Sequence, residues 1–273
     1  MKKIFLSLLF LWQTGLFAQN SFVGVLEYEV TVRINRDNLP AEAASNPNIP
    51  DAFNFNQKLH VNGNAAKQEI IWNFPMRTGS NPQQQQRAGN QFRRFMPETF
   101  INFAEKKISI VTNIPRDTVN FDKYVVEKNY TATPDLKLDN KKTKKIAGYN
   151  CKKATLKTKD DEFTIWYTTD LGFTYSPLAL GSEAMGRMWG MGRRGGNQQN
   201  NIQFPAIVIE NAVIVSVEGS EIGYDLKKVS IEKVETDLVK VPADAQKVTD
   251  EELAEIMKSR RGNYRFQTGG GRN

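Results

Sequence analysis

Residues 144–170 read K-K-I-A-G-Y-N-C-K-K-A-T-L-K-T-K-D-D-E-F-T-I-W-Y-T-T-D, and this stretch decides the fold class. Its first half, 149–157, alternates with a period of two: Ala154 and Leu156 share one face, and Lys153 and Lys157 share the other. Such alternation is typical of a half-buried strand. We therefore predict a strand over 149–157.

The second half of the stretch predicts a partner strand. Phe163, Ile165 and Tyr167 alternate with Thr164, Trp166 and Thr168. The polar residues 159–161 between the two halves predict the turn. The stretch is therefore a β-hairpin with one apolar face.

The rest of the sequence repeats this pattern and contains few helix signals. Residues 22–34 predict a long strand whose faces carry Val23 and Glu27 on one side and Leu26 and Tyr28 on the other. Asn62-Gly63 predicts a tight turn between two strands. Further strands are predicted over 57–61, 65–74, 99–103, 107–113, 121–128, 204–210, 212–218 and 222–235, with a loop over 38–51.

One helix is predicted near the end of the sequence. Thr249 and Glu252 have the spacing of a capping box, in which each side chain satisfies the free backbone N–H of the other residue. Leu253, Ile256 and Met257 follow on one face, and Gly262 predicts the end of the helix. The predicted fold class is therefore mostly β: an antiparallel meander forming a half-barrel or curved sheet, with a short C-terminal helix.

The N-terminus predicts export. Lys2 and Lys3 precede the apolar run 4–12, and Ala18 precedes a cleavage site ahead of Gln19. The run is shorter than the roughly 20 residues that a membrane-spanning helix needs. We therefore expect a signal peptide over 1–18, and a periplasmic or outer-membrane-associated protein that is not an integral membrane protein.

The domain organisation follows from length and composition. A mature chain of about 250 residues can bury a full core, so residues 19–261 are predicted to form a single β-rich domain. Low-complexity loops rich in Asn, Gln, Gly and Arg are expected at about 75–97 and 180–203, and a disordered basic Gly/Arg tail at 262–273.

Charge, cysteine and histidine content restrict the chemistry. The net charge of +7 suits anionic head groups better than nucleic acid, although a charge this small is also typical of simple solubility. Cys151 is the single cysteine, so no internal disulfide forms, and a lone strand cysteine is most often a small buried side chain. His60 is the single histidine, which leaves a His-based zinc cluster without a second ligand.

No catalytic signature is present. The sequence lacks a G-x-S-x-G nucleophile motif, a phosphate-binding loop and a dinucleotide-binding glycine motif. His60 is followed by Val61 on a predicted strand, with no nucleophile signature nearby. We therefore expect a protein that is not an enzyme, with no catalytic residues and no cofactor.

The hairpin and a later segment carry a family resemblance. The later segment is 204–210, F-P-A-I-V-I-E, and the hairpin residues are Lys145, Ile146, Gly148, Tyr149, Cys151, Lys153, Ala154, Trp166, Tyr167 and Thr168. They resemble the GLPGLI family of secreted Gram-negative envelope proteins, and relatives built like the lipoprotein carrier LolA. Segment 204–210 stands where the family's name-giving motif would fall, with Phe for the first Leu and Ala206 for a Gly.

The resemblance implies an exported, non-catalytic binding protein. The concave face of a half-barrel would bind a lipid, another apolar ligand or an envelope protein, whereas a closed sandwich would use the same residues as its core. The pattern does not separate these two architectures. The predicted apolar binding face consists of Phe163, Ile165, Tyr167, Ile207 and Ile209.

A methionine-rich segment supports an alternative function. Met185, Met188 and Met191 recur at three-residue spacing around Trp189. Thioethers select Cu(I), so a copper-handling protein is one alternative, and an apolar lid or partner-binding loop is the other interpretation of the segment. A scaffold subunit of an outer-membrane assembly, with the low-complexity loops as contact arms, is a further alternative.

Overall fold

The computed structural model describes residues 22–38, 41–47, 49–72, 96–117, 120–180 and 205–261. Within these ranges, twelve strands form one open, curved sheet. The predicted fold class is therefore confirmed. The strands are β1 (Val23–Arg33), β2 (Ala52–Asn62), β3 (Ala65–Trp72), β4 (Glu98–Asn102), β5 (Lys107–Pro115), β6 (Phe121–Asn129), β7 (Lys137–Ile146), β8 (Tyr149–Lys157), β9 (Glu162–Thr168), β10 (Val213–Glu218), β11 (Ile222–Ser230) and β12 (Gln246–Lys247).

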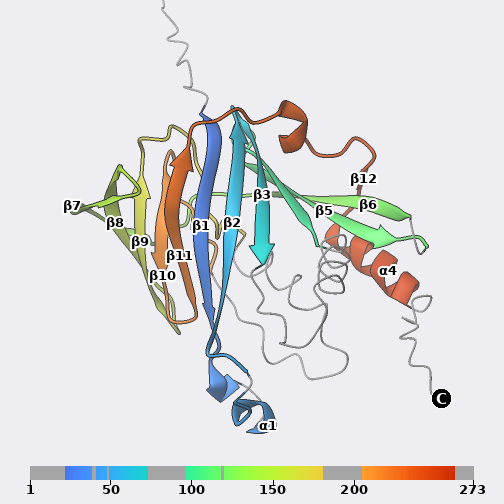
Figure 1. Ribbon diagram of the computed structural model, residues 1–273, viewed down its shortest axis with the longest axis horizontal. Coiled ribbons are helices and arrows are strands. Elements are labelled where there is room, and N and C mark those ends of the chain that lie inside the picture. The colour runs from blue at the N-terminus through green and yellow to red at the C-terminus, as the bar shows by residue number, and fades with distance from the viewer. Residues whose placement is uncertain are drawn as a thin grey trace, which may run out of the picture.

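The sheet consists of two antiparallel meanders that meet at β1. The strand order is β12-β6-β5-β4-β3-β2-β1-β11-β10-β9-β8-β7. β1 pairs with β2 on one side and with β11 on the other, and β12 adds a short parallel pair at the far edge. Figure 1 shows β1 and β2 in the middle of the molecule and β7 at its left limit.

The inner face of the sheet is apolar and filled by the chain itself. On β1, Leu26, Tyr28, Val30 and Val32 point to this face and are buried. The crossing segments 171–180 and 205–212 pack against them and against the corresponding residues of the other strands. The hydrophobic core therefore lies between the sheet and these segments.

Two buried tyrosines of the core form side-chain hydrogen bonds. The Tyr28 hydroxyl donates to the Ile214 carbonyl at 2.9 Å, and Gln57 Nε2 donates to the Tyr175 hydroxyl at 2.7 Å. Burial raises the pKa of both tyrosines well above the usual range. These hydrogen bonds offset the free-energy cost of removing the polar groups of these side chains from water.

The helices are short and lie at the margins of the sheet. They are η1 (Arg36–Asn38), α1 (Ala41–Ala44), η2 (Thr236–Val239) and α4 (Asp250–Arg261). α4 begins with the predicted capping box, because Thr249 N donates to Glu252 Oε2 at 2.8 Å and Glu252 N donates to Thr249 Oγ1 at 3.2 Å. Its Leu253 packs on the inner face against β5 and β6.

Several details differ from the sequence predictions. β2 begins at Ala52 rather than at 57, β11 ends at Ser230 rather than at 235, and α1 lies within the predicted loop 38–51. The turn between β2 and β3 is Gly63-Asn64 rather than Asn62-Gly63, since Asn62 already pairs with Ala65. β7 was not predicted, because its ten residues are mostly lysines and other polar residues without apolar alternation. The described part of the predicted strand 204–210 is irregular.

The irregular segment 205–209 uses its backbone to join crossing chains instead of a sheet. Ile207 N donates to the Leu178 carbonyl at 3.1 Å, and Val208 N donates to Thr133 Oγ1 at 2.8 Å. Thr133 N returns a bond to the Val208 carbonyl at 3.0 Å. The strand prediction is wrong here because these partners lie beneath the sheet, where β-branched residues are equally well buried.

Cys151 is fully buried in β8, as predicted for a structural thiol. Its Sγ contacts the Tyr149 carbonyl at 3.4 Å, and burial raises the pKa of the thiol. A raised pKa lowers the thiolate fraction at neutral pH, and burial removes access for a reagent. The native thiol should therefore be inert.

We expect native protein to resist a small maleimide and to be labelled only after unfolding in urea, measured by mass spectrometry. The control is the double variant Cys151→Ala/Leu138→Cys, because Leu138 is 51% exposed on β7 and should present an accessible thiol. Rapid labelling of the native parent at the rate of this control would contradict the structural role of Cys151.

Candidate functional site

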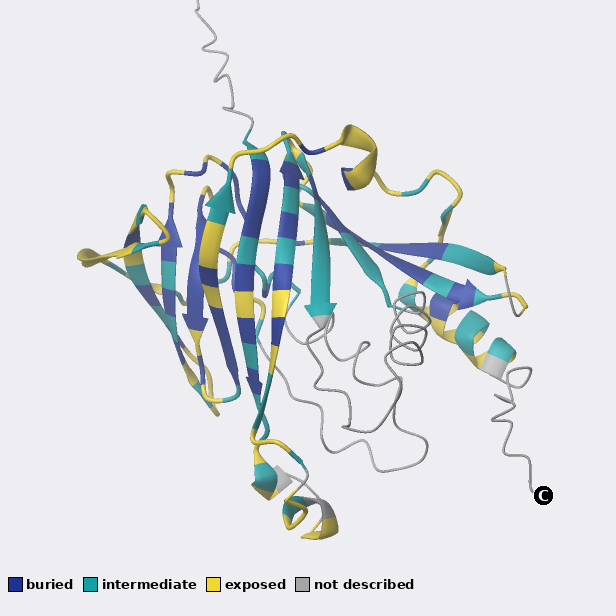
Figure 2. Cartoon of the chain, in the orientation of Figure 1, coloured by how far each residue is buried: buried dark blue, intermediate teal, exposed yellow. Residues whose placement is uncertain are grey.

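The outer face of the sheet is covered on one half and open on the other. The chain after β11 lies over the outer face of β1 and β3–β6, where Val234 and Val239 pack against Val25, and Ala245 packs against Phe100. Along β2, β1, β11 and β9, outward-facing exposed or half-buried residues alternate with buried ones that face inward, as Figure 2 shows along β1, β2 and β11; on β10, only Glu218 is exposed. This polar outer face is the candidate site.

The strand register aligns the polar side chains into two rows across the face. The first row is rich in hydroxyl and amide groups and the second in carboxylates; both follow from direct cross-strand pairs. The first row contains Thr155, Thr164, Glu218, Gly223, Thr31 and Asn54. The second row contains Lys153, Trp166, Ser216, Asp225, Glu29 and Asn56.

Hydrogen bonds link neighbours within the rows. Thr31 Oγ1 donates to Asn54 Oδ1 at 2.9 Å in the first row, and Ser216 Oγ donates to Asp225 Oδ1 at 2.8 Å in the second. Lys227, beside the rows on β11, lies 2.9 Å from Glu29 Oε2. The side chains are thus held in place, while Asn54, Asp225 and Glu29 remain exposed.

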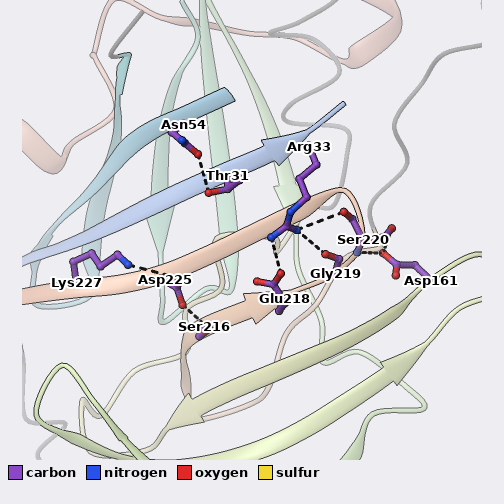
Figure 3. A network of polar contacts seen from close by, with 10 residues as sticks. All are labelled: Thr31, Arg33, Asn54, Asp161, Ser216, Glu218, Gly219, Ser220, Asp225 and Lys227. Carbon is purple, nitrogen blue, oxygen red and sulfur yellow. Dashed lines mark hydrogen bonds and ion pairs between the residues drawn. The ribbon is translucent and has the colours of Figure 1, made fainter. Parts of the chain in front are cut away.

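Arg33 organises the end of the face at the β10–β11 hairpin. Its Nη2 donates to Glu218 Oε1 at 2.6 Å, and its Nη1 donates to the Gly219 carbonyl at 2.9 Å. Figure 3 shows the guanidinium lying between these two acceptors and Ser220. The planar guanidinium therefore joins the end of β1 to the hairpin turn.

Asp161 joins the same turn to the β8–β9 hairpin. Its Oδ2 accepts from both the backbone N and the hydroxyl of Ser220, each at 2.9 Å. Glu221 lies in the same turn, and burial together with the Asp161 charge raises the pKa of its carboxyl.

The face therefore has a definite chemical character. Its carboxylates outnumber its cations, and hydroxyl and amide groups stand between them at strand spacing. Such side chains both donate to and accept from a ligand rich in hydroxyl groups. Within the described ranges, His, Cys, Asp and Glu form no cluster that could hold a metal ion.

The residues predicted as an apolar binding face do lie together, but inside the core. Phe163, Ile165, Tyr167, Ile207 and Ile209 belong to one hydrophobic cluster, and none of them is more than 9% exposed. Phe163, Ile165 and Tyr167 lie on the inner face of β9, and Ile207 and Ile209 belong to the crossing segment that covers the inner face of the sheet. Their predicted role in binding a ligand stays a prediction.

The other predicted site residues are placed as follows. Met185, Met188, Met191 and Trp189 lie outside the described residues, as do the signal peptide and most of both low-complexity loops. His60 lies on β2 with its Nε2 3.3 Å from Glu69 Oε2. Among the described residues, no helix has the length and apolar character needed to cross a membrane.

Sequence reasoning missed the polar outer face. The sequence pattern places Thr164 and Trp166 on one face of a predicted strand, whereas Asn54 and Asn56 lie outside the predicted strands. The rows arise only from the register between strands distant in sequence, such as β1 and β11. No local signal specifies that register.

Comparison with known proteins gives a family match. The family model described as "N-glycanase peptide, N-terminal domain" matches residues 62–218. No curated protein matches the sequence. Two solved structures are similar in fold: PNGF-II in space group P21, with 15% identity and a TM-score of 0.48, and PNGF-II in space group C2, with 13% identity and a TM-score of 0.47.

The structural similarities cover unequal shares of the chains. The first covers 88% of this chain and 34% of the PNGF-II chain, and the second covers 86% and 33%. This chain therefore spans about a third of the length of these solved proteins.

The family match overturns three predictions. The predicted membership of the GLPGLI family, with LolA-like relatives, is wrong, because the model that matches is that of an N-glycanase domain. The predicted function, a non-catalytic binding protein of GLPGLI type, is wrong for the same reason. The prediction of a protein that is not an enzyme is also wrong at the level of family, since N-glycanases are enzymes.

One substitution tests how closely the turn between β10 and β11 packs against Phe163 and Asp161. A Cβ at Gly219 would lie 2.5 Å from Phe163 Cε1 and 2.9 Å from Asp161 Oδ2. Phe163 is buried and cannot move aside, so Gly219→Ala should destabilise the protein by roughly 1–3 kcal/mol through overpacking. Urea unfolding followed by circular dichroism measures this cost.

The matched control is Ser220→Ala, at the neighbouring exposed position. It removes the hydroxyl bond to Asp161 but keeps the backbone bond, so a cost of about 0.5 kcal/mol is expected. Equal stability of the Gly219→Ala variant and the parent would show that the turn is looser than the structure indicates.

Proposed function

The chain belongs to the family of N-glycanase N-terminal domains, and on that basis we propose that it takes part in the release of N-glycans from glycoproteins. The observation that carries this proposal is the family match over residues 62–218, which extends from the end of β2 to the end of β10. The matched region includes Trp166, Ser216 and Glu218 of the polar outer face.

Within that function, we assign to this chain the engagement of the glycoprotein substrate. A glycan presents many hydroxyl groups and little apolar surface, so it is bound by side chains that donate and accept hydrogen bonds. The polar outer face offers such groups on an open surface, with Asn54, Asn56 and Asp225 exposed. The apolar inner face is filled by the chain's own segments and suits this ligand less well.

The tip of the face adds groups suited to proton transfer. The raised pKa of Glu221 keeps its carboxyl protonated to higher pH than an ordinary glutamate, and the Asp161 carboxylate contributes to that shift. A proton donor of this kind suits a reaction that must protonate a leaving group. Measurement of freed glycan, with the chain alone and with an added N-glycanase, decides whether this chain or a protein partner carries out the catalytic step.

Export and partners complete the proposal. A signal peptide over 1–18 would deliver the chain outside the cytoplasm, where it would meet glycoproteins of the surroundings. Its partners in this proposal are a glycoprotein and, where the chain does not catalyse alone, an envelope protein that supplies the catalytic groups. No nucleic acid has a role in it.

The test uses protein comprising residues 19–273 and a fluorescent glycopeptide with one N-linked glycan. We expect the glycopeptide to bind more tightly than the same peptide without its glycan, measured by fluorescence anisotropy. Asn56→Ala/Asp225→Ala should weaken binding roughly five- to 150-fold, because each lost hydrogen bond contributes roughly 0.5–1.5 kcal/mol.

The control for this experiment is Glu255→Ala/Ser259→Ala on the exposed face of α4, which should bind like the parent. Chromatography of freed glycan, with the chain alone and with an added N-glycanase, separates a catalytic role from an accessory one. Absence of both glycan-dependent binding and any effect on glycan release would overturn the proposal.

A further inference from the structure

The β7–β8 end of the sheet carries an unusual concentration of unpaired lysines. We define the lysine edge as β7, β8 and the turn that follows, whose lysines are Lys137, Lys141, Lys142, Lys144, Lys145, Lys152, Lys153, Lys157 and Lys159. Among the described residues, only Lys142 and Lys157 of this set lie within 4 Å of a carboxylate oxygen. Most of the positive charge at this edge is therefore uncompensated.

Outside the lysine edge, most described lysines form ion pairs. Lysines on the other strands, on α4 and on the segment 233–247 form ion pairs, with Lys228 as the described exception. The mild net charge of the whole protein is thus concentrated at one end of the sheet. A local field of this kind attracts an anionic partner.

The shape of the edge limits which partner fits. β7 is the terminal strand, eight of its ten residues are exposed, and its pairing with β8 is interrupted between Asp139 and Thr143. Edge lysines and a broken register both hinder the addition of another strand. The edge is therefore poorly suited to an acidic peptide that would extend the sheet.

The composition of the edge favours a diffuse array of phosphates. No arginine lies between 130 and 170, so no planar guanidinium fork is available for one specific anion. Lysines on flexible stems act as point charges and suit many phosphates at once. The ring of Trp166, the nearest aromatic platform for a nucleic-acid base, already has Lys144 Nζ 5.8 Å from its centroid.

One apolar side chain stands among these lysines. Leu138 lies on β7 and is 51% exposed, although large apolar residues of the sheet are otherwise mostly buried. Leu138 follows Lys137 and precedes Asp139 on this lysine-rich strand. An exposed leucine on such a strand can enter the boundary between head groups and acyl chains while nearby ammonium groups contact phosphate. Leu138 therefore favours a lipid surface over a water-soluble polyanion.

We propose that the lysine edge docks the protein on an anionic lipid surface, with Leu138 entering the interface and the unpaired lysines contacting lipid phosphates. This docking leaves the polar outer face of β1, β2, β10 and β11 available, because the lysine edge lies at the far end of the sheet. The proposal does not depend on the proposed role in N-glycan release.

Vesicle co-sedimentation tests the proposal with protein comprising residues 19–273. Vesicles containing about one-third phosphatidylglycerol should bind the protein, and pure phosphatidylcholine vesicles should not. Binding should disappear near 1 M salt, where the Debye length falls to about 3 Å. Leu138→Gln should weaken binding several-fold at constant charge.

The decisive variant is Lys141→Gln/Lys145→Gln/Lys152→Gln, in which three exposed, unpaired lysines are neutralised. Each lysine near an anionic surface contributes roughly a fivefold factor in affinity, so the triple variant should lose about a hundredfold. The matched control is Lys233→Gln/Lys240→Gln/Lys258→Gln, which removes the same charge from exposed, ion-paired lysines elsewhere and should retain parental binding. Circular dichroism confirms that all variants are folded.

The remaining outcomes each count against the proposal. Absent vesicle binding, or an equal loss in both triple variants, would overturn it, because the former shows no docking and the latter shows only an effect of net charge. Preferential capture of poly-glutamate or single-stranded DNA over the anionic vesicles would also overturn it, and would assign the edge to a protein or nucleic-acid partner.

Discussion

The pairing of β1 with β11 is the constraint on which the rest of the structure depends. Without it, the sheet would be two separate meanders, β1–β6 and β7–β11, each with an open apolar face and two unpaired edges. A buried hydrogen bond strengthens the junction, because the Tyr28 hydroxyl reaches the Ile214 carbonyl across 186 residues of sequence. Closing so long a stretch of chain costs conformational entropy before the contact stabilises the fold, so a pairing this distant in sequence is expected to slow folding.

The same junction determines which surfaces are free. Bringing β10 and β11 beside β1 places the crossing segments 171–180 and 205–212 beneath the sheet, where they fill the inner face. The chain leaving β11 then runs over the outer face of the other half, towards β12 and α4. Among the described residues, the polar outer face and the β7 edge remain open, and these are the surfaces on which binding is proposed.

The sequence predicted the local parts of this fold well. Alternation identified most strands, and the capping box located the start of α4 at Thr249, because both signals arise from residues close in sequence. β7 is not predicted, because an exposed edge strand buries too little apolar surface for its apolar residues to recur with a period of two. Segment 205–209 was mistaken for a strand because β-branched residues suit any buried extended backbone, whereas its hydrogen bonds go to Thr133 and Leu178.

The candidate site was less predictable for a related reason. Apolar alternation predicts that Phe163, Ile165 and Ile207 form a binding face. The same pattern is expected for an open binding face and for one that the chain itself covers. The covering segments have no periodic pattern that would distinguish the two. The polar half of each strand carried the information that was overlooked. Thr31, Glu218 and Asn54 are individually ordinary surface residues, and they become an ordered array only when the register aligns β2, β1, β11 and β10. In a sheet whose inner face is occupied, recognition has to use the outer face and the edges, so the residues that look merely solvated are the ones to examine.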